Sequence, residues 1–351
     1  MEDLEYNPAQ QSPILMNNSS ASEAARVLVL GGTGTIGRAA VAALVRRGYQ
    51  VICIARPQAG SGGKLTQDKT TQLLQGAEVI FGDVTSPEFL AEKVFRHHHF
   101  YAVVSCLASR TGEPLDAWAI DYQAHINVLS LAKDSGVKQM VLLSAICVQK
   151  PRLVFQHAKL AFEKALMDSG LTYSIVRPTA FFKSLSGQVA RVQKGKPFFL
   201  FGDGTLTACK PISDPDLSEY LADCLEDVTL QNKILPIGGP GPAINPLQQG
   251  EYLFKILKRK PRFKSVPVAF LSGVATFLDG VGKIVPPLAA KAELAWIGHY
   301  YATESMLLLN PDTGLYDADA TPETGTDTLF AYFQRLIDGT DTADRVDYDL
   351  F

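Results

Sequence analysis

Residues 26–37, RVLVLGGTGTIG, decide how the first half of this chain folds. The apolar run Arg26–Leu30 has the composition of a buried strand, and the pattern after Gly37, RAAVAALVRRG, is helical. Between them, glycines three apart let backbone amides approach a pyrophosphate, beside the partial positive charge of the helix N-terminus. A tight structural turn is the alternative, but the strand before and the helix after favour a dinucleotide-binding loop. The expected cofactor contacts in this loop are Gly31, Thr33, Gly34, Thr35, Ile36, Gly37 and Arg38.

Short β-rich runs alternate with helical patterns as far as Pro178, which is typical of βαβ units. The pattern predicts an α/β fold, a Rossmann-like doubly wound parallel sheet with an interleaved C-terminal substrate-binding portion. Gly48 and Gly136 are expected to end helices with positive φ. The predicted organisation is a flexible tail at 1–24, a cofactor domain at 25–200 and a substrate-binding portion at 201–351. The expected strands are Arg26–Leu30, Val51–Ala55, Glu78–Phe81, Ala102–Cys106, Gln139–Ser144, Tyr173–Arg177 and Ile234–Ile237, with helices at Ile36–Arg47 and His125–Ser135.

Composition excludes several classes of function. A net charge of -3 and a pI near 6.1 provide no overall basic field, which argues against nucleic acid as the partner. Three consecutive histidines, His97 to His99, would point about 100° apart on a helix, so we expect no metal site there. The apolar run Val266–Leu278 is shorter than the about 20 residues that cross a bilayer. We therefore expect no transmembrane segment, while contact with a membrane surface stays open.

The end of the second predicted strand indicates which cofactor is bound. Folds that bind NADH usually place Asp or Glu there to bond the ribose 2′-hydroxyl, but this strand ends in Ala55 and Arg56. The planar guanidinium of Arg56 can pair with a 2′-phosphate, and Arg38 is a second candidate. The alternative is that both are solvated surface arginines. The sequence favours NADPH, with Asp83 and Val84 expected near the adenine and Cys106 beside the cofactor.

The strand layout, the loop GGTGTIG and the segment GDVT resemble the atypical short-chain dehydrogenase/reductases of the NmrA-like type. The resemblance implies catalytic roles for Ser144 and Lys159, with Lys159 also holding the nicotinamide ribose. It implies that Asn127 supports the site, although an isolated Asn is more often an exposed helix residue. The superfamily's proton-donating Tyr is replaced by Phe155, in the segment FQHAK.

Phe155 has no ionisable proton, so ordinary carbonyl reduction lacks its general acid. Two readings follow. The chain binds NADPH without chemistry, as a sensor or assembly factor, or it reduces a conjugated carbon–carbon double bond whose electrons a large ring can delocalise. Candidate proton donors are Tyr300, Tyr301 and His157, although each of these residue types is more often structural.

The second half resembles the NADPH-dependent divinyl chlorophyllide 8-vinyl reductases of phototrophs, through the segments GHYYATESM and YDADATP together with FQHAK and SCLASRTG. The resemblance implies a tetrapyrrole substrate, divinyl chlorophyllide, and a location in the bacterial cytoplasm or the chloroplast stroma. Another conjugated alkene, such as a phenylpropanoid, is the alternative substrate. Lys183 or Arg191 could meet the substrate carboxylate. The expected substrate-binding residues are Phe155, Phe181, Phe182 and Lys183, although any single one of the aromatic residues is more often core.

Overall fold

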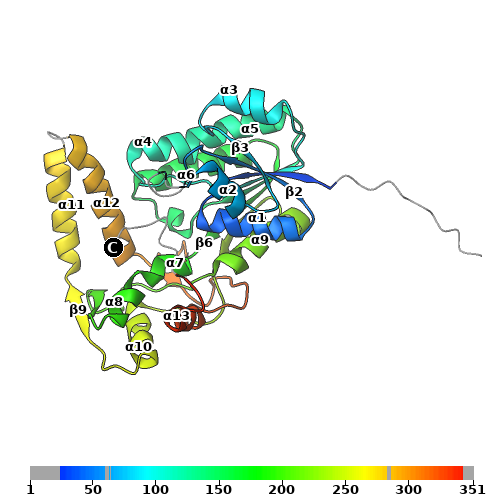
Figure 1. Cartoon of the computed structure of the whole chain (residues 1–351). Helices are drawn as coiled ribbons and strands as arrows, with labels where there is room; N and C mark the ends of the chain where they lie inside the picture. Colours follow the sequence, from blue (N-terminus) through cyan, green and yellow to red (C-terminus); the bar gives the residue numbers. More distant parts are fainter. Residues whose placement is uncertain (1–23, 60–62, 64, 283–285, 343–351) are drawn as a thin grey trace, which may run out of the picture.

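Seven parallel strands form the central sheet, in the order β3-β2-β1-β4-β5-β6-β8 (Figure 1). The structure, a computed structural model, describes residues 24–59, 63, 65–282 and 286–342. The predicted tail, residues 1–24, lies outside these ranges except for its last residue. The strands of the sheet are β1 (Arg26–Leu30), β2 (Gln50–Ala55), β3 (Glu78–Phe81), β4 (Ala102–Ser105), β5 (Gln139–Leu143), β6 (Thr172–Pro178) and β8 (Lys233–Ile237).

This sheet confirms the predicted fold class. Strands β1 and β3 have the predicted bounds, β6 is one residue longer at each end, and the others differ by one residue at one end. Cys106 and Ser144 fall just outside β4 and β5, yet their amides still donate to Leu30 and Val176 of the neighbouring strands. The two glycines expected to end helices have φ of 84° at Gly48 and 74° at Gly136, because only glycine adopts this conformation without strain.

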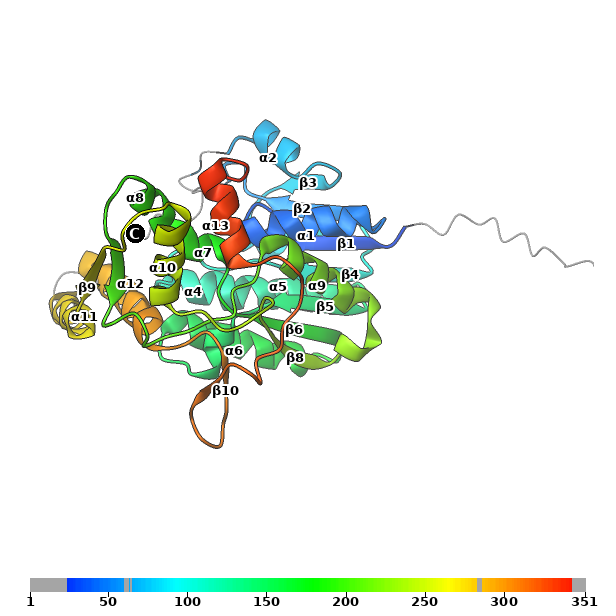
Figure 2. The same ribbon diagram turned by 90° about the horizontal axis from the view of Figure 1, so that it is seen from below.

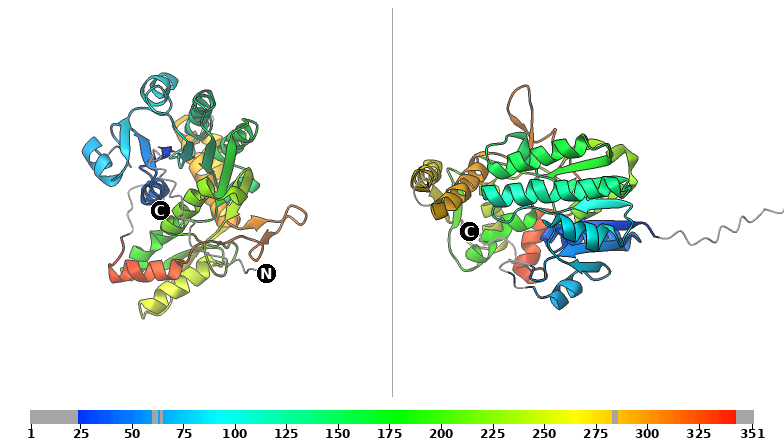
Figure 3. Two further views of the ribbon diagram at one scale, coloured as in Figure 1. Left: turned by 90° about the vertical axis from the view of Figure 1, so that its right-hand side faces the viewer. Right: turned by 90° about the horizontal axis from the view of Figure 1, so that it is seen from above.

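Helices cover both faces of the sheet, because successive side chains of a buried strand point in opposite directions. Val27 and Val29 of β1 face α1 and α9, which pack side by side (Figure 2). Leu28 and Leu30 face the layer that contains α5 and α6 (Figure 3). The helices around the sheet are α1 (Thr35–Arg46), α2 (Gln67–Leu73), α3 (Pro87–Phe89) with the π-helical η2 (Leu90–Phe95), α4 (Pro114–Ala117) with the π-helical η3 (Trp118–Ala124), α5 (His125–Asp134), the 3-10 turn η4 (Ile146–Gln149), α6 (Val154–Met167), α9 (Asp214–Glu226) and the 3-10 turn η6 (Val228–Leu230).

The C-terminal half interleaves with the sheet, since α9 and β8 both come from it. The remaining C-terminal elements surround a separate core that includes Phe198, Phe254 and Phe333. Within it, β7 pairs in parallel with β9, whose residues lie 65 positions later in the chain (Phe198 opposite Phe263). These elements are α7 (Phe182–Leu185), the 3-10 turn η5 (Ser186–Gln188), α8 (Val189–Gln193), β7 (Phe198–Phe201), α10 (Pro246–Ile256), β9 (Phe263–Val266), β10 (Leu308–Leu309), β11 (Tyr316–Asp317) and α13 (Leu329–Asp338).

Two long helices, α11 (Val268–Gly282) and α12 (Pro286–Thr303), pack along each other and stand at one side of the molecule (Figure 1). The predicted apolar run Val266–Leu278 forms the end of β9 and most of α11. Within the described residues, no helix combines the length and the apolar character that crossing a bilayer requires.

Candidate active site

The loop after β1 brings the chain close to the loop after β4, at the point where the strand order reverses. Gly31 has a φ of 72°, and a Cβ there would lie 2.6 Å from the Cys106 carbonyl oxygen. A Cβ on Gly37 would lie 2.1 Å from the Gly31 oxygen. Both glycines are therefore required by the protein's own backbone packing.

Gly34 differs from the other two glycines of the loop. It precedes the first residue of α1, and a Cβ on it would come no nearer than 3.4 Å to another heavy atom, the Gly31 oxygen. The protein itself leaves room above Gly34, at a helix N-terminus whose first amides have no intrahelical acceptor. This cradle fits the pyrophosphate of a dinucleotide, which a side chain at this position would obstruct.

Cationic groups lie around this cradle. The Lys183 ammonium donates to the Thr35 hydroxyl at 3.0 Å, and its charge, like that of Arg38, also acts on Asp214. Burial raises the pKa of Asp214, and the two cations oppose that shift. Lys183 of α7, which is expected to bind the substrate, thus contacts the first residue of α1, directly after the glycine loop. Arg56 follows β2 and is exposed, as the expected reader of a 2′-phosphate must be.

The loop after β3 is held by its own hydrogen bonds. The Asp83 carboxylate accepts from the amide and hydroxyl of Thr85, at 2.9 and 2.7 Å, while Val84 packs against the core below. Asn127 of α5 donates to the Thr85 carbonyl at 3.3 Å. Asn127 therefore positions the loop that carries Asp83.

Lys159 of α6 makes a buried ion pair with Asp121 of η3. The Nζ–Oδ1 distance is 2.9 Å, and the side chains are 11% and 0% exposed. The same Asp121 oxygen accepts the Ser109 amide, at 3.3 Å, from the loop after β4. Burying two charges is costly unless they are paired and hydrogen-bonded, so this pair fixes where the Lys159 ammonium can lie.

His125 lies one helical turn after Asp121 and joins the same network. Its Nδ1 donates to the Ile120 carbonyl at 2.8 Å, so the unprotonated Nε2 accepts the Ser105 hydroxyl at 2.7 Å. Burial, reinforced by the charge of Lys159, lowers the pKa of His125 to about 4. His125 is therefore neutral at physiological pH and positions the β4 loop without supplying a proton.

Ser144 takes part in a different buried network. Its hydroxyl donates to Glu163 at 2.5 Å, and Glu163 is ion-paired with Arg177 of β6. The Ser144 hydroxyl is thus committed to Glu163, and the catalytic role expected of Ser144 stays a prediction.

Phe155 lies one turn before Lys159 on α6, at the junction with α12. It packs in a cluster with Ile146, Cys147 and Tyr300, and a Cβ on Gly112 would touch both Phe155 and Ile297. The two helices α11 and α12 are called the C-terminal hairpin below. This hairpin covers the start of α6, at the position where the superfamily has its Tyr.

The two tyrosines of α12 have different environments. Tyr300 is 3% exposed, and its hydroxyl donates to the carbonyls of Cys147 and Lys150, at 2.9 and 3.0 Å. Tyr301 is 45% exposed, and its hydroxyl lies 3.9 Å from the Cys147 sulfur, a group on which the charge of Lys159 also acts. Tyr300 is therefore structural, whereas Tyr301 presents a partly exposed phenol beside Cys147. His157 is exposed on α6.

Glu304, just after α12, anchors the hairpin to the loop after β5. Its carboxylate is 6% exposed and accepts from Lys150, Arg152 and Tyr316, at 2.7, 2.8 and 2.8 Å. Burial alone would raise the pKa of Glu304, but these three partners lower it. The segments YYATESM and YDADATP are thus joined through one buried charge.

The remaining expected substrate residues lie apart from Phe155. Phe182 is 3% exposed and its ring tilts against Tyr332 in the C-terminal core, while Phe181 packs against the core of the sheet. The Arg191 guanidinium stacks on Phe199, 3.9 Å from the ring centroid. Phe155 and Lys159 lie one turn apart on α6, whereas Phe181, Phe182 and Arg191 lie in other parts of the structure.

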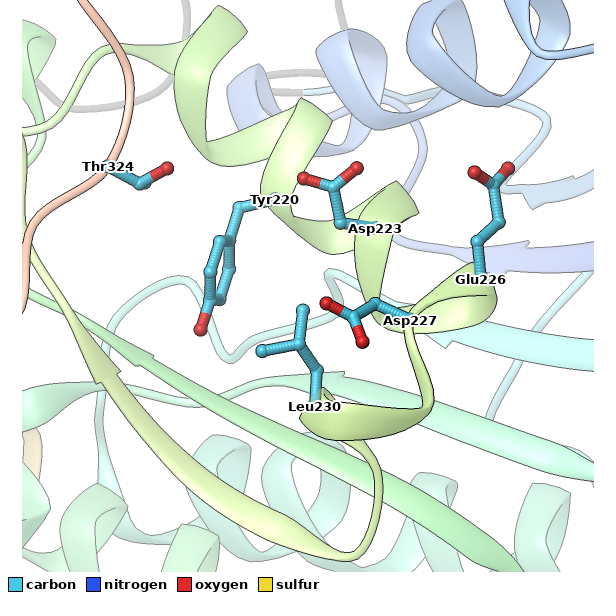
Figure 4. A pocket seen from close by; sticks show the side chains of 6 residues that line it. All are labelled: Tyr220, Asp223, Glu226, Asp227, Leu230 and Thr324. Carbon is cyan, nitrogen blue, oxygen red and sulfur yellow. The ribbon is translucent and has the colours of Figure 1, made fainter.

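Two surface hollows lie away from this region. One is acidic, between α9, η6 and Thr324 (Figure 4), and the other is lined by the starts of β1, β2 and β3. Ligands of doubly wound sheets bind beyond the carboxyl ends of the strands, so neither hollow fits the cofactor. His97 and His98 line the second, and no group of residues suited to a metal occurs in the described part of the chain.

Comparisons with known proteins agree with this geometry. A family model described as NAD(P)H-binding matches residues 31–228. The chain is 50% identical over 355 residues to the chloroplastic divinyl chlorophyllide a 8-vinyl-reductase of Arabidopsis thaliana, covering 95% of this chain and 85% of that protein. The corresponding protein of Zea mays is 51% identical over 316 residues, covering 89% and 79%.

The chain belongs to the divinyl chlorophyllide a 8-vinyl-reductase family. Among solved structures, the complex of leucoanthocyanidin reductase with NADPH from Vitis vinifera has a TM-score of 0.63 at 17% identity, covering 89% of this chain and 99% of that one. That similarity shows that the two chains share a fold. In this 8-vinyl-reductase family member, the match to the NAD(P)H-binding family model begins at Gly31, in the glycine loop before α1.

Sequence reasoning missed Asp121, His125 and Glu304. Asp121 and His125 are four residues apart and so share one helical face, a signal that could have been noticed beside the apolar residues around them. The role of Glu304 could not be predicted, because its partner Lys150 lies 154 residues earlier in the chain.

Replacing glycines of the loop separates packing from cofactor binding. Gly37→Ala should lower the free energy of unfolding by about 2 kcal/mol through overpacking against Gly31. Gly34→Ala should change stability by less than about 1 kcal/mol, but should weaken NADPH binding at least about tenfold by obstructing the cradle. Urea unfolding and fluorescence titration measure the two effects. Unchanged affinity in Gly34→Ala would show that the cofactor does not lie on this loop.

Proposed function

We propose that this chain uses NADPH to reduce the 8-vinyl group of divinyl chlorophyllide a to an ethyl group. The observation that carries the proposal is the placement of Lys159, which is buried, paired with Asp121 and one turn from Phe155. Phe155 in turn packs in the same cluster as Tyr300 of α12, the helix that Glu304 anchors. Family membership supports the substrate, and the cradle at Gly34 supports the cofactor.

When bound, NADPH supplies a hydride. In the proposed reaction that hydride would go to the terminal vinyl carbon and a proton to the internal carbon, so that the double bond would become a single bond and NADPH would become NADP⁺. The negative charge that develops between these additions spreads over the conjugated macrocycle, so a residue at position 155 need not protonate an oxygen. Phe155 can instead offer an apolar surface to the flat ring.

Each charged group has a proposed task. Lys159, held by Asp121, would bind the nicotinamide ribose and add positive potential where negative charge develops. Lys183 and the first turn of α1 would bind the pyrophosphate, and Arg56 with Arg38 the 2′-phosphate. Asp83 and Val84 would lie near the adenine, and Cys106 beside the cofactor. Ser144 would support Lys159 indirectly, by fixing the loop after β5.

Tyr301 is the proposed proton donor. Its phenol is half-exposed near the C-terminal end of α12 and lies beside Cys147, which belongs to the cluster that Phe155 packs against. Tyr300 is committed to two carbonyl groups and His157 lies on the exposed side of α6, so Tyr301 fits the role best of these three.

The proposed setting follows from the substrate. The relatives from plants are chloroplastic by name, which supports a chloroplast location for a chain from a plant or alga. Within the chloroplast we propose the stroma, and for a chain from a phototrophic bacterium the cytoplasm. The proposed partners are the tetrapyrrole substrate and, through a surface described below, a membrane; nucleic acid is not among them.

A turnover assay tests the function. Purified protein with NADPH and divinyl chlorophyllide a should shift the Soret band to the blue. Lys159→Met should lower kcat roughly 100-fold, while Lys164→Met, at an exposed position on the same helix, should leave it unchanged. Cofactor binding without any turnover of the wild-type protein would favour a non-catalytic sensor or assembly factor, and turnover of other conjugated alkenes alone would reject the substrate.

The proton donor has its own test. Tyr301→Phe should lower kcat roughly 100-fold, because general acid catalysis contributes at least that much, with NADPH affinity unchanged. Tyr101→Phe, at an exposed residue just before β4 and so at the amino ends of the strands, is the control. If Tyr301→Phe turns over at the wild-type rate while the wild type is active, the phenol does not deliver the proton.

Cofactor choice depends on Arg56. Arg56→Asp replaces a cation by a carboxylate and should weaken NADPH binding roughly 100-fold, with NADH changed less than about threefold. Arg96→Asp, an exposed substitution elsewhere, should affect neither. Equal losses for both cofactors would mean that Arg56 does not read the 2′-phosphate.

A further inference from the structure

The outer face of α11 carries large apolar side chains exposed to solvent. Phe270, Val274 and Phe277 are 63%, 36% and 69% exposed, and their spacing places them along one side of the helix. The other side, with Leu271, Ala275 and Leu278, is more buried and faces the rest of the hairpin. An exposed row of this kind is typical of an interaction surface.

A basic ridge adjoins this face. Residues 255–264, KILKRKPRFK, contain six basic side chains and no acidic one, and all six residues are exposed. Arg259 donates to the carbonyls of Val192 and Gln193 at the end of α8, which brings the exposed Lys194 and Lys196 to the same place. The basic ridge is Lys194, Lys196, Lys255, Lys258, Arg259, Lys260, Arg262 and Lys264.

The ridge is electrostatically distinct from the rest of the chain. It holds eight positive charges in a chain whose net charge is -3, so the remainder carries -11. Strand β9 leads directly from the ridge into α11, so the segment that carries the cations adjoins the helix that carries the phenyl rings, at one side of the molecule (Figure 1).

We infer that the basic ridge and the outer face of α11 together dock this protein on a bilayer that contains anionic lipids. The cations match the charge of the headgroups, and the phenyl rings can enter the acyl boundary beneath them. A second copy on the same face would bring two ridges of like charge together, which opposes self-association.

The hairpin then has two working faces. Its outer helix contacts lipid, while α12 contacts Phe155 through Ile297 and carries Tyr301. On the proposed function, whose substrate is a flat apolar ring with a carboxylate, this arrangement places the candidate site beside the surface into which such a ring partitions. The docking itself does not depend on that function.

Vesicle sedimentation tests the docking. The full chain should pellet with phosphatidylcholine vesicles containing about 30% phosphatidylglycerol, should bind pure phosphatidylcholine at least about tenfold more weakly, and should be released when salt is raised from about 0.1 to 0.5 M. The double variants Phe270→Ser with Phe277→Ser, and Lys258→Glu with Lys260→Glu, should each lose at least about tenfold in binding.

Matched controls place the same changes elsewhere on the surface. Leu115→Ser with Leu315→Ser, at residues 88% and 69% exposed, and Lys133→Glu with Lys164→Glu should bind as the wild type does. Turnover with detergent-dispersed substrate should be equal in all variants, which separates this inference from the proposed function. Wild-type protein that does not pellet with anionic vesicles, ridge and α11 variants that pellet normally, or a dimer that these variants abolish would overturn it.

Discussion

The buried ion pair between Lys159 and Asp121 is the interaction on which the candidate site depends. It joins α6 to η3, and Asp121 and His125 together hold the loop after β4 through Ser109 and Ser105. A lone buried ammonium would lose its proton or its position, whereas a paired one keeps both. The loop it orders is the one that Gly31 contacts, so the cofactor cradle and the cation are fixed relative to each other.

A second constraint comes from the C-terminal hairpin. Glu304 gathers Lys150, Arg152 and Tyr316, and Tyr300 adds hydrogen bonds to the same segment after β5. These contacts bring α12 against the start of α6, so that Phe155 packs in one cluster with Tyr300 and Ile297 of α12. The superfamily's acid is absent at position 155, but the element that covers the position carries a phenol of its own. The absence of a proton-donating side chain at position 155 is thus compatible with reduction of a carbon–carbon double bond in place of a carbonyl group.

Sequence patterns predicted the sheet well, because β1, β3 and the glycine turns at Gly48 and Gly136 follow from local chemistry alone. The pairing of β7 with β9 could not be predicted, since both strands are short and distant in sequence. The direction of Lys183 was also beyond the sequence: the same four-carbon stem could reach a substrate or, as it does, the Thr35 hydroxyl. Asp121 gained its importance only when folding placed Lys159 beside it.

Isotope tracing tests the central claim most directly, that this site delivers a hydride and a proton to the two carbons of a vinyl group. With cofactor deuterated at the transferred position of nicotinamide C4, deuterium should appear on the methyl carbon of the new ethyl group. In deuterated water with ordinary NADPH, it should appear on the adjacent methylene carbon. Proton NMR of the product distinguishes the two positions. Label from the cofactor on the methylene carbon, or none in the product, would contradict the account.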